Sequence, residues 1–220
     1  AVCGTVNDVA TSGATPRYLS VGFVLEEGFP IDDLRRICNS MAECAREARV
    51  ALVTGDTKVV NRGYGDGVFI NTSGVGTLAP DVELGGARCR PGDKVLVTGT
   101  LGDHGITIMS CRESLSFSSG LESDAAPLNH LIAEVLAAAP HTRCFRDPTR
   151  GGLASTLNEL ASQSNTDITV EEDAIPVKPA VQGACEMLGY DVLQVANEGK
   201  MVCVVAAEEA DAALAAMRAN

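Results

Sequence analysis

The chain has 220 residues, of which 45% are hydrophobic and 21% charged, so it can bury a core and is not disordered by composition. Its 29 acidic and 17 basic residues give a net charge of −12 at pH 7, which argues against general affinity for nucleic acid or for an anionic membrane. No apolar run approaches the roughly 18 to 20 residues of a membrane-spanning helix. Residues 1–20 also lack the basic start and apolar block of a secretory signal. We therefore expect a soluble globular protein with neither nucleic-acid nor membrane partners.

The first part of the chain alternates β-rich runs with one long amphipathic helix. The segment 6–14 predicts a helix or turn, and a strand follows at 18–27. Residues 31–49 predict a helix, because apolar side chains recur at steps of three and four, at positions 31, 34, 38, 41, 45 and 48. Strands are expected next at 50–56 and 67–76, and the glycine-rich turn between them predicts a hairpin.

The second part begins after residues 79–92, which are rich in glycine and proline and lack periodicity. We place a domain boundary there, with one domain at 1–82 and the other at 83–220. The elements expected after it are a strand at 93–100, helices at 104–112 and 126–138, a loop and helix at 144–165, a strand at 168–172, a helix at 179–189, a strand at 200–207 and a final helix. Alternating strands and helices in two unequal units predict a two-domain α+β or mixed α/β protein.

The eight cysteines are scattered, form no CxxC motif, and lie mostly in apolar stretches, while the three histidines are isolated. This spacing does not favour a structural zinc site. We expect buried, reduced thiols, which are typical of cytoplasmic proteins.

Neither of the common nucleotide-binding motifs is present. The single Gly-Lys pair, Gly199-Lys200, has Gln194 five positions before its glycine, where a P-loop needs glycine. The run GYGDG at 63–67 does not match GxGxxG, and it opens a strand rather than a helix. Walker-type and Rossmann-type nucleotide binding are therefore not supported.

What remains is a set of loops at strand ends, each with a charged residue beside a glycine or a short polar side chain. They are Asn7-Asp8, Gly55-Asp56-Thr57-Lys58, Gly102-Asp103-His104-Gly105, Arg146-Asp147 with Arg150-Gly151-Gly152, and Asn197-Glu198-Gly199-Lys200. Carboxylates at strand ends suit Mg²⁺, which keeps positions free for phosphates and water. A helix that starts at two glycines offers free N–H groups to an anion. Two of the four lysines fall in these loops, so positive charge is concentrated where phosphates would bind.

Each loop also has a purely structural interpretation. An Asp beside Gly is most often a turn residue or a helix N-cap, and His104 and Glu198 fit ordinary positions at the start of an element. Asp56 with Lys58 is the stronger pair, because it follows a buried-looking strand. The residues alone give only weak support to an enzyme that acts on magnesium-bound phosphates.

At these same residues the sequence resembles the HypE family of hydrogenase maturation proteins. The segments that carry the resemblance occur in the family's order and cover essentially the whole chain: GTVNDVATSGATPRYLSVGFVLEEGFP, TGDTKVV, LVTGTLGDHG, the RE pair at 112–113, CFRDPTRGGLASTLNE, PVKPAV and ANEGK. The family belongs to a superfamily that includes aminoimidazole ribonucleotide synthetase, selenophosphate synthetase and thiamine-monophosphate kinase. The resemblance implies an N-terminal α/β dimerisation domain and a C-terminal α+β domain, both incomplete here, with ATP in the cleft between them.

The resemblance also implies a reaction and partners. Members dehydrate a thiocarboxamide on a C-terminal cysteine to a thiocyanate, using ATP and Mg²⁺. The carboxamide comes from the carbamoyltransferase HypF, and the cyanide goes to the iron of the HypC–HypD complex during [NiFe]-hydrogenase assembly. A homodimer in the cytoplasm is expected.

The motif match assigns roles to named residues. The resemblance places Asp8 and Asp56 at Mg²⁺ and ATP. The other residues that it places at ATP are Asn7, Thr57, Asp147, Arg150, Gly151 and Gly152. Lys58 and Glu198 are the catalytic candidates, for phosphate stabilisation and proton transfer, and His104 is a weaker one.

The resemblance is incomplete, and two alternatives stay open. The family's upstream segment and its cysteine-bearing tail are absent, so we expect a piece of a longer protein that does not turn over by itself. A related ATP-dependent kinase or synthetase is one alternative. A non-catalytic module that binds maturation partners is the other.

Overall fold

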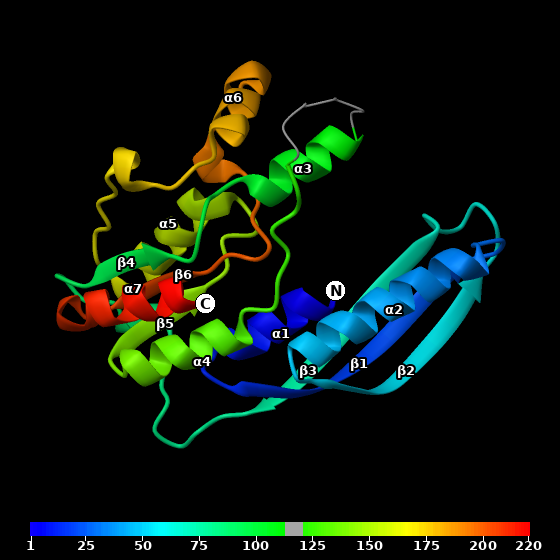
Figure 1. Ribbon diagram of the computed structural model, residues 1–220, viewed down its shortest axis with the longest axis horizontal. Helices are drawn as coiled ribbons and strands as arrows, with labels where there is room; N and C mark the ends of the chain where they lie inside the picture. The colour runs from blue at the N-terminus through cyan, green and yellow to red at the C-terminus, as the bar shows by residue number, and fades with distance from the viewer. Residues whose placement is uncertain (113–120) are drawn as a thin grey trace.

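A computed structural model of the chain describes residues 1–112 and 121–220. The strands of the described residues form two three-stranded sheets, and both sheets carry helices (Figure 1). The first sheet contains β1 (Thr15–Glu26), β2 (Ala51–Val60) and β3 (Val68–Thr77), in the order β2-β1-β3. The second contains β4 (Lys94–Val97), β5 (Thr142–Arg146) and β6 (Val202–Val205), in the order β4-β6-β5. The arrangement is the expected α+β one.

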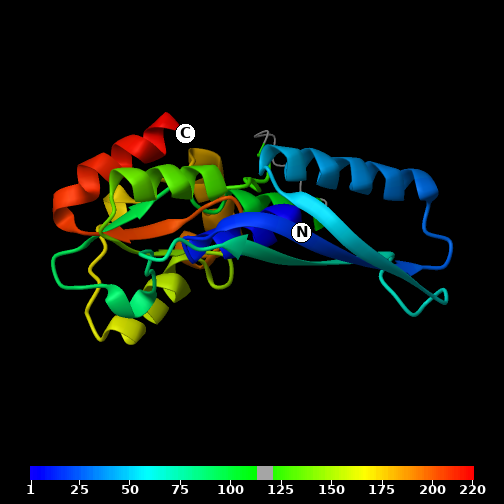
Figure 2. The same ribbon diagram turned by 90° about the horizontal axis from the view of Figure 1, so that it is seen from below.

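Two helices cover one face of the first sheet. β1 and β2 are parallel, so α2 (Ile31–Glu47) crosses over between them, as parallel pairing requires. α1 (Val2–Thr11) packs on the same face, where Val6, Leu19 and Met41 share one core cluster. Figure 2 shows α2 lying along this side of the sheet.

The opposite face of the first sheet is not covered by any described segment. Residues that pair across strands share a face, so the rows Asp56–Gly22–Asn71 and Lys58–Val24–Phe69 lie on this open side. Tyr18 and its partner Val75 belong to it too and are 52% and 62% exposed. β2 is the edge strand, and nine of its ten residues are exposed.

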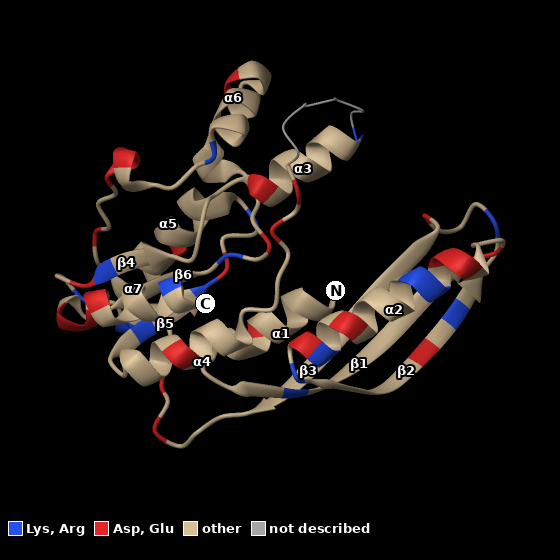
Figure 3. Ribbon diagram, viewed as in Figure 1, with Lys and Arg blue, Asp and Glu red and all other residues tan. Residues whose placement is uncertain are grey.

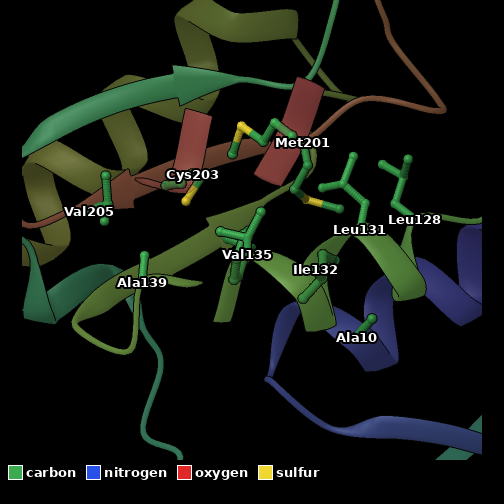
Figure 4. Close-up of a cluster of buried hydrophobic side chains, with 12 residues drawn as sticks. Ala10, Leu128, Leu131, Ile132, Val135, Ala139, Met201, Cys203 and Val205 are labelled. Carbon is green, nitrogen blue, oxygen red and sulfur yellow. The ribbon is translucent and has the colours of Figure 1, made fainter. Parts of the chain in front are cut away.

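The central strand of the second sheet, β6, is buried on both faces. The side chains of β6 alternate, with Cys203 packing toward α4 (Asn129–Ala138) and α7 (Ala210–Ala219), and Val202 and Val204 toward α5 (Gly152–Ser164). Figure 4 shows Met201, Cys203 and Val205 directed toward the side chains of α4. Because both faces are covered, all four residues of β6 are buried. α3 (Asp103–Arg112) and α6 (Pro179–Leu188) pack together beside this core.

α1 joins the two units. Its Ala10 belongs to the core cluster of α4, although Val2 and Val6 of the same helix belong to the first sheet's core. The loop that follows β5 also approaches α1, and the two segments form walls of one cavity. One short helix therefore carries part of both cores.

The predicted hairpin between 50–56 and 67–76 is wrong. β1 lies between β2 and β3, so these two strands are not neighbours and residues 61–67 step over the end of β1. The carboxylate of Glu26, the last residue of β1, accepts hydrogen bonds from the backbone N–H groups of Gly63 and Gly67. These bonds lower the pKa of Glu26 and hold the turn across the strand end.

Two strand predictions in the second unit also fail. Residues 168–172 do not form a strand, because Ile168 and Val170 pack beside Leu157 of α5 rather than against a ladder. Conversely, β5 lies where the sequence predicts a loop. β5 has only five residues, and its apolar Cys144 and Phe145 are adjacent rather than alternating, so no strand pattern stands out in sequence. The other predicted elements are present, with ends shifted by a few residues.

The predicted helix at 31–49 is confirmed as α2, but only part of its apolar face is buried. Met41, Ala45 and Ala48 lie in the core, whereas Ile31 is 60% exposed and Cys38 is exposed. The middle of the helix, at Cys38 and Met41, borders an open groove of 340 Å³ beside β2. No helix in the described ranges is long and apolar enough to cross a bilayer.

Candidate functional site

A cavity of 410 Å³ opens where the two units meet. Its walls come from α1, the loop between β5 and α5, the first turns of α5, and the loop before β6; the lining residues are Gly4, Asn7, Asp8, Arg146, Asp147, Thr149, Arg150, Thr156, Glu159 and Glu198. Five residues that the sequence predicts for the site therefore come together here: Asn7, Asp8, Asp147, Arg150 and Glu198. They lie up to 191 positions apart in the chain, counting from 7 to 198.

Two acidic residues, Asp8 and Asp147, line this cavity. The pKa of Asp8 is raised, first because the cavity wall partly removes water from its carboxylate and second because Asp147 lies nearby. Arg146 opposes the shift with its positive charge. Burial and the neighbouring Asp147 both disfavour the ionised form of Asp8, and a bound cation would relieve this cost.

The basic side chains at the cavity differ in what they contact. Arg146 pairs with Glu159 of α5 at 2.8 Å, and both side chains are about half exposed. Arg150 has no ion-pair partner in the described part of the chain, and it lies just before α5 begins. A free guanidinium beside the first turn of a 13-residue helix is an arrangement that suits a phosphate group.

The loop that carries Glu198 is fixed by its neighbour Asn197, which is fully buried. The Oδ1 atom of Asn197 accepts a hydrogen bond of 2.7 Å from the N–H of Gly102, and its Nδ2 atom donates to the carbonyl oxygens of Pro148 and Val195. One side chain thus connects the loop after β4, the loop after β5 and the loop before β6. Glu198 and Asp147 are positioned by this common connection.

Asn7 has a comparable structural function on the other wall. Its Nδ2 atom donates to the carbonyl oxygen of Ala126 at 3.0 Å, and its Oδ1 atom accepts from the N–H of Leu128 at 2.7 Å. The side chain ties α1 to the segment before α4, although the resemblance predicts it as a cofactor ligand. That prediction stays open, but both amide ends already have protein partners.

Gly151 and Gly152 begin α5 with left-handed backbone, at φ values of 66° and 62°. A Cβ atom on Gly152 would lie 2.4 Å from the carbonyl oxygen of Leu193, so the absence of a side chain is required for packing against residues 193–195. Neither glycine is among the residues that line the cavity. Packing accounts for Gly152 without a phosphate.

Asp56, Thr57 and Lys58 lie outside the cavity of this chain. They are in the middle of the edge strand β2, which Figure 1 shows on the side of the first sheet farthest from β5. Figure 3 shows the acidic and basic residues of β2 as neighbouring red and blue bands. Pairing with Gly22 and Val24 puts Asp56 and Lys58 on the open face and Thr57 on the helix face. Their assignment to ATP, Mg²⁺ and catalysis stays a prediction.

His104 and Asp103 also lie elsewhere. His104 lines a separate cavity of 690 Å³ between α3 and the segment 189–196, and its Nδ1 atom is 2.8 Å from the hydroxyl of Ser123. Asp103 is buried and pairs with Lys178 at 3.0 Å. The second residue of the RE pair at 112–113 is outside the described residues.

The sequence reasoning missed Gly4, Thr149, Thr156 and Glu159. Thr156 and Glu159 are three residues apart on α5, so they share a helix face, and that spacing was the available signal. Nothing in the sequence indicated that this face, rather than the apolar one, would border a cavity. Thr149 lies in a loop that the sequence analysis selected only for its charged residues.

The donor set at the cavity fits a magnesium–phosphate ligand. In the part of the chain that the structure describes, no group of three or more His, Cys, Asp and Glu side chains is arranged to hold a metal on its own. Asp8 and Asp147 supply two hard oxygen donors, and Mg²⁺ commonly takes one or two carboxylates together with phosphate oxygens and water.

Comparison with known proteins places these features in a family. The chain matches the model of the "AIR synthase related protein, N-terminal domain" over residues 1–78 and of the corresponding "C-terminal domain" over residues 90–220. It is 58% identical over 219 residues to the carbamoyl dehydratase HypE of Cupriavidus necator, covering 100% of this chain and 62% of that protein. A chain in a crystal structure of a HypE–HypF complex is 48% identical with a TM-score of 0.98, and the match covers 100% of this chain and 72% of that one. The chain belongs to the HypE family.

Two further solved structures are similar to this chain. The crystal structure of hydrogenase maturation protein HypE in complex with ATP has a TM-score of 0.97 at 51% identity, with 99% of this chain and 65% of that chain covered. Thiamine monophosphate kinase from Aquifex aeolicus is 19% identical with a TM-score of 0.76, over 92% of this chain and 70% of that one, which shows the fold alone. The chain spans less than two thirds of the length of the HypE protein from Cupriavidus necator.

The packing at Gly152 predicts opposite effects of alanine at two helical glycines. Gly152→Ala should destabilise the protein by about 2–4 kcal/mol, because of its positive φ and the contact with the carbonyl of Leu193. Gly183→Ala, in the middle of α6 where an added Cβ would meet no atom within 4 Å, should stabilise it by about 0.5–1 kcal/mol. Urea denaturation of both variants is the measurement. Equal effects would contradict the packing argument.

The raised pKa of Asp8 predicts a pH-dependent gain in stability for Asp8→Asn. A carboxyl whose pKa is higher in the folded than in the unfolded state opposes folding when it is ionised, so the substitution stabilises the ligand-free protein at pH 7–8. This gain is lost as the pH falls below about 4, where the carboxyl is protonated in both states. The melting temperature against pH measures it. Asp81→Asn, at an exposed position between the two units, is the control and should show no such profile.

Proposed function

We propose that the protein containing this chain is an ATP-dependent carbamoyl dehydratase of [NiFe]-hydrogenase maturation. The observation that carries the proposal is the cavity that unites Asp8, Asp147, Arg150 and Glu198, in a chain 58% identical to a protein named carbamoyl dehydratase HypE. The reaction converts the S-carboxamide of a C-terminal cysteine to a thiocyanate, while ATP becomes ADP and phosphate. The thiocyanate is the cyanide donor to iron.

The reaction needs the protein to hold the phosphates, to hold the cation and to remove a proton. An amide oxygen is a poor leaving group, and ATP with Mg²⁺, when bound, supplies the phosphoryl group that makes it a good one. Arg150 and the first turn of α5 would hold phosphate oxygens, and Asp8 with Asp147 would hold the cation. Glu198 is half-buried on a rigid loop and would take a proton from the amide nitrogen as the C≡N bond forms.

In this proposal Lys58 acts at the cavity of a second copy of the chain, because it lies outside the cavity of its own chain. Supporting observations are that β2 is an edge strand and that the open face beside it exposes Tyr18, Phe69 and Val75, each more than half exposed. An uncovered apolar sheet face next to an unpaired edge is typical of an interface. We infer a homodimer through this face, in which Asp56, Thr57 and Lys58 of one subunit approach the cavity of the other. Within each subunit, residues 1–82 and 83–220 would be the two domains.

The further partners follow from the family. A related structure is described as a HypE–HypF complex, so we infer that a HypF carbamoyltransferase loads the terminal cysteine and that a HypC–HypD complex receives the cyanide. These assignments, and a cytoplasmic location, rest on the family rather than on a surface of this chain.

Two alternatives remain distinguishable. The fold shared with thiamine monophosphate kinase favours a kinase that phosphorylates another substrate, and the exposed sheet face favours a non-catalytic binding module. A kinase would release ADP without removing water from the cysteine carboxamide. A non-catalytic module would neither release ADP nor remove water.

The central prediction concerns the intact mass of the full-length protein carbamoylated at its terminal cysteine. Loss of one water should occur only with Mg-ATP, and Lys58→Ala should slow this loss by about 100-fold or more while changing ATP affinity little. Intact mass spectrometry and nucleotide titration measure the two quantities. Equal loss of ATP binding and dehydration would remove Lys58 from the catalytic step, and an unchanged wild-type mass with ATP bound would favour the alternatives.

Mixed dimers test whether the site is shared between subunits. Lys58→Ala and Glu198→Gln homodimers should each be nearly inactive. Mixing their subunits at equal ratio should restore about a quarter of the wild-type rate, because half of the dimers are mixed and each has one intact site. If Lys58 served the cavity of its own chain, every site would carry one defect and mixing would restore nothing. Mixtures of Lys58→Ala with itself are the control.

A further inference from the structure

Two cysteines from different helices meet between α1 and α2. The Sγ atoms of Cys3 and Cys44 lie 3.0 Å apart, with 41 positions between them in the sequence. A disulfide S–S bond is about 2.0 Å long, so a displacement of about 1 Å would bring the two sulfurs to bonding distance. Both side chains are half-buried, so small reagents can reach them.

We propose that Cys3 and Cys44 form a reversible oxidation site, a dithiol in the reduced protein and a disulfide in the oxidised one. The oxidant is a small-molecule disulfide of the glutathione class. The site is separate from the cavity, since neither cysteine lines it.

The exchange balances in two steps. The Cys3 thiolate attacks one sulfur of oxidised glutathione, which breaks the S–S bond of that molecule and releases a glutathione thiolate. The Cys44 thiol loses its proton as it attacks the Cys3 sulfur of the mixed disulfide, and the second glutathione is released. The two thiol protons end on the two glutathione molecules; the cysteine pair loses two electrons and the oxidant gains them.

The environment of Cys44 sets this order. Burial, and then its contact with Cys3, raise the pKa of Cys44 to about 12, so this thiol keeps its proton at neutral pH. Cys3 is therefore the first sulfur to react with an external disulfide, since the thiolate is the reactive form. Cys44, already in contact, completes the bond.

The other cysteines of the described residues lack either a close cysteine partner or exposure to a small reagent. Cys89 and Cys144 are also close, at 3.7 Å, but both are buried, and the contact with Cys89 followed by burial raises the pKa of Cys144. Cys38 and Cys111 are exposed, and no cysteine contacts either of them in the described part of the chain. Only the pair Cys3–Cys44 combines a close partner with a route for a reagent.

The bond would act on the helix that carries the cavity residues. Cys3 lies about one turn before Asn7 and Asp8 on α1, and α2 supports the same sheet face. A disulfide between the helices would fix α1 at its first turn and remove conformational freedom from the unfolded chain. Oxidation should therefore raise the stability of the folded protein.

The test uses the full-length protein, first reduced and then equilibrated under native conditions with buffers of defined oxidised-to-reduced glutathione ratio. Free thiols are blocked with N-ethylmaleimide, and peptides are mapped by mass spectrometry. We expect a Cys3–Cys44 linked peptide, glutathione adducts at Cys38 and Cys111, and Cys89 and Cys144 unmodified until unfolding. The melting temperature should rise by about 5–10 °C and return after dithiothreitol.

Variants make the outcome decisive. In Cys44→Ser, Cys3 should carry glutathione and the melting temperature should not rise on oxidation, whereas Cys38→Ser should behave as the wild type. The proposal is overturned if wild-type Cys3 and Cys44 are both alkylated under oxidising buffer, or if each carries its own glutathione. A bond from either residue to a different cysteine would overturn it as well.

Discussion

The hydrogen bonds of Asn197 are the interaction on which the cavity depends. Its amide connects Gly102, Pro148 and Val195, which belong to three loops around one end of the second sheet. Asn197 is fully buried, so loss of its side chain would leave backbone groups without partners at a cost of about 1–3 kcal/mol for each. The close approach of Gly152 to residues 193–195 adds a steric condition at the same place. Glu198 is held in place by the hydrogen bonds of Asn197 and by the packing of Gly152 against residues 193–195.

The same loops carry charges that oppose one another. Asp8 and Asp147 lie near each other, and water is partly removed from Asp8, so ionisation of Asp8 costs some stability. Lys200 lies 3.9 Å from the buried carboxylate of Asp124, whose Oδ1 atom accepts a hydrogen bond from the N–H of Glu198. The lysine expected at the phosphates is thus engaged in supporting the loop. Of the described basic residues that line the cavity, Arg146 pairs with Glu159, and Arg150 has no ion-pair partner and is available to a ligand.

The sequence predicted the loops better than their arrangement. Loops with charged residues beside glycines at strand ends contain Asp147, Arg150 and Glu198, and the structure brings these three residues to one cavity, because such loops lie where strands stop and side chains converge. Which loops share an edge depends on strand order, and strand order was not predictable locally. The turn at 61–67 has the composition of a hairpin, yet the Glu26 carboxylate holds it across β1. That single crossing sends β2 to the outer edge of its sheet.

The open sheet face beside β2 carries both polar and apolar side chains. A row with Gly22 at its centre separates Asp56 from Asn71 by a residue without a side chain, while the next row joins Lys58 to the apolar Val24 and Phe69. A sheet face that served only to pack against a second copy would be apolar in both rows. A face that served only to bind a charged ligand would not expose Tyr18 and Val75 beside it. The mixture fits a proposed interface whose apolar part holds two subunits together while its polar part contributes Asp56 and Lys58 to the partner's cavity. Because Thr57 alternates to the helix face, its side chain would have no direct part in that contact, and among these three residues the polar contribution would be limited to the other two.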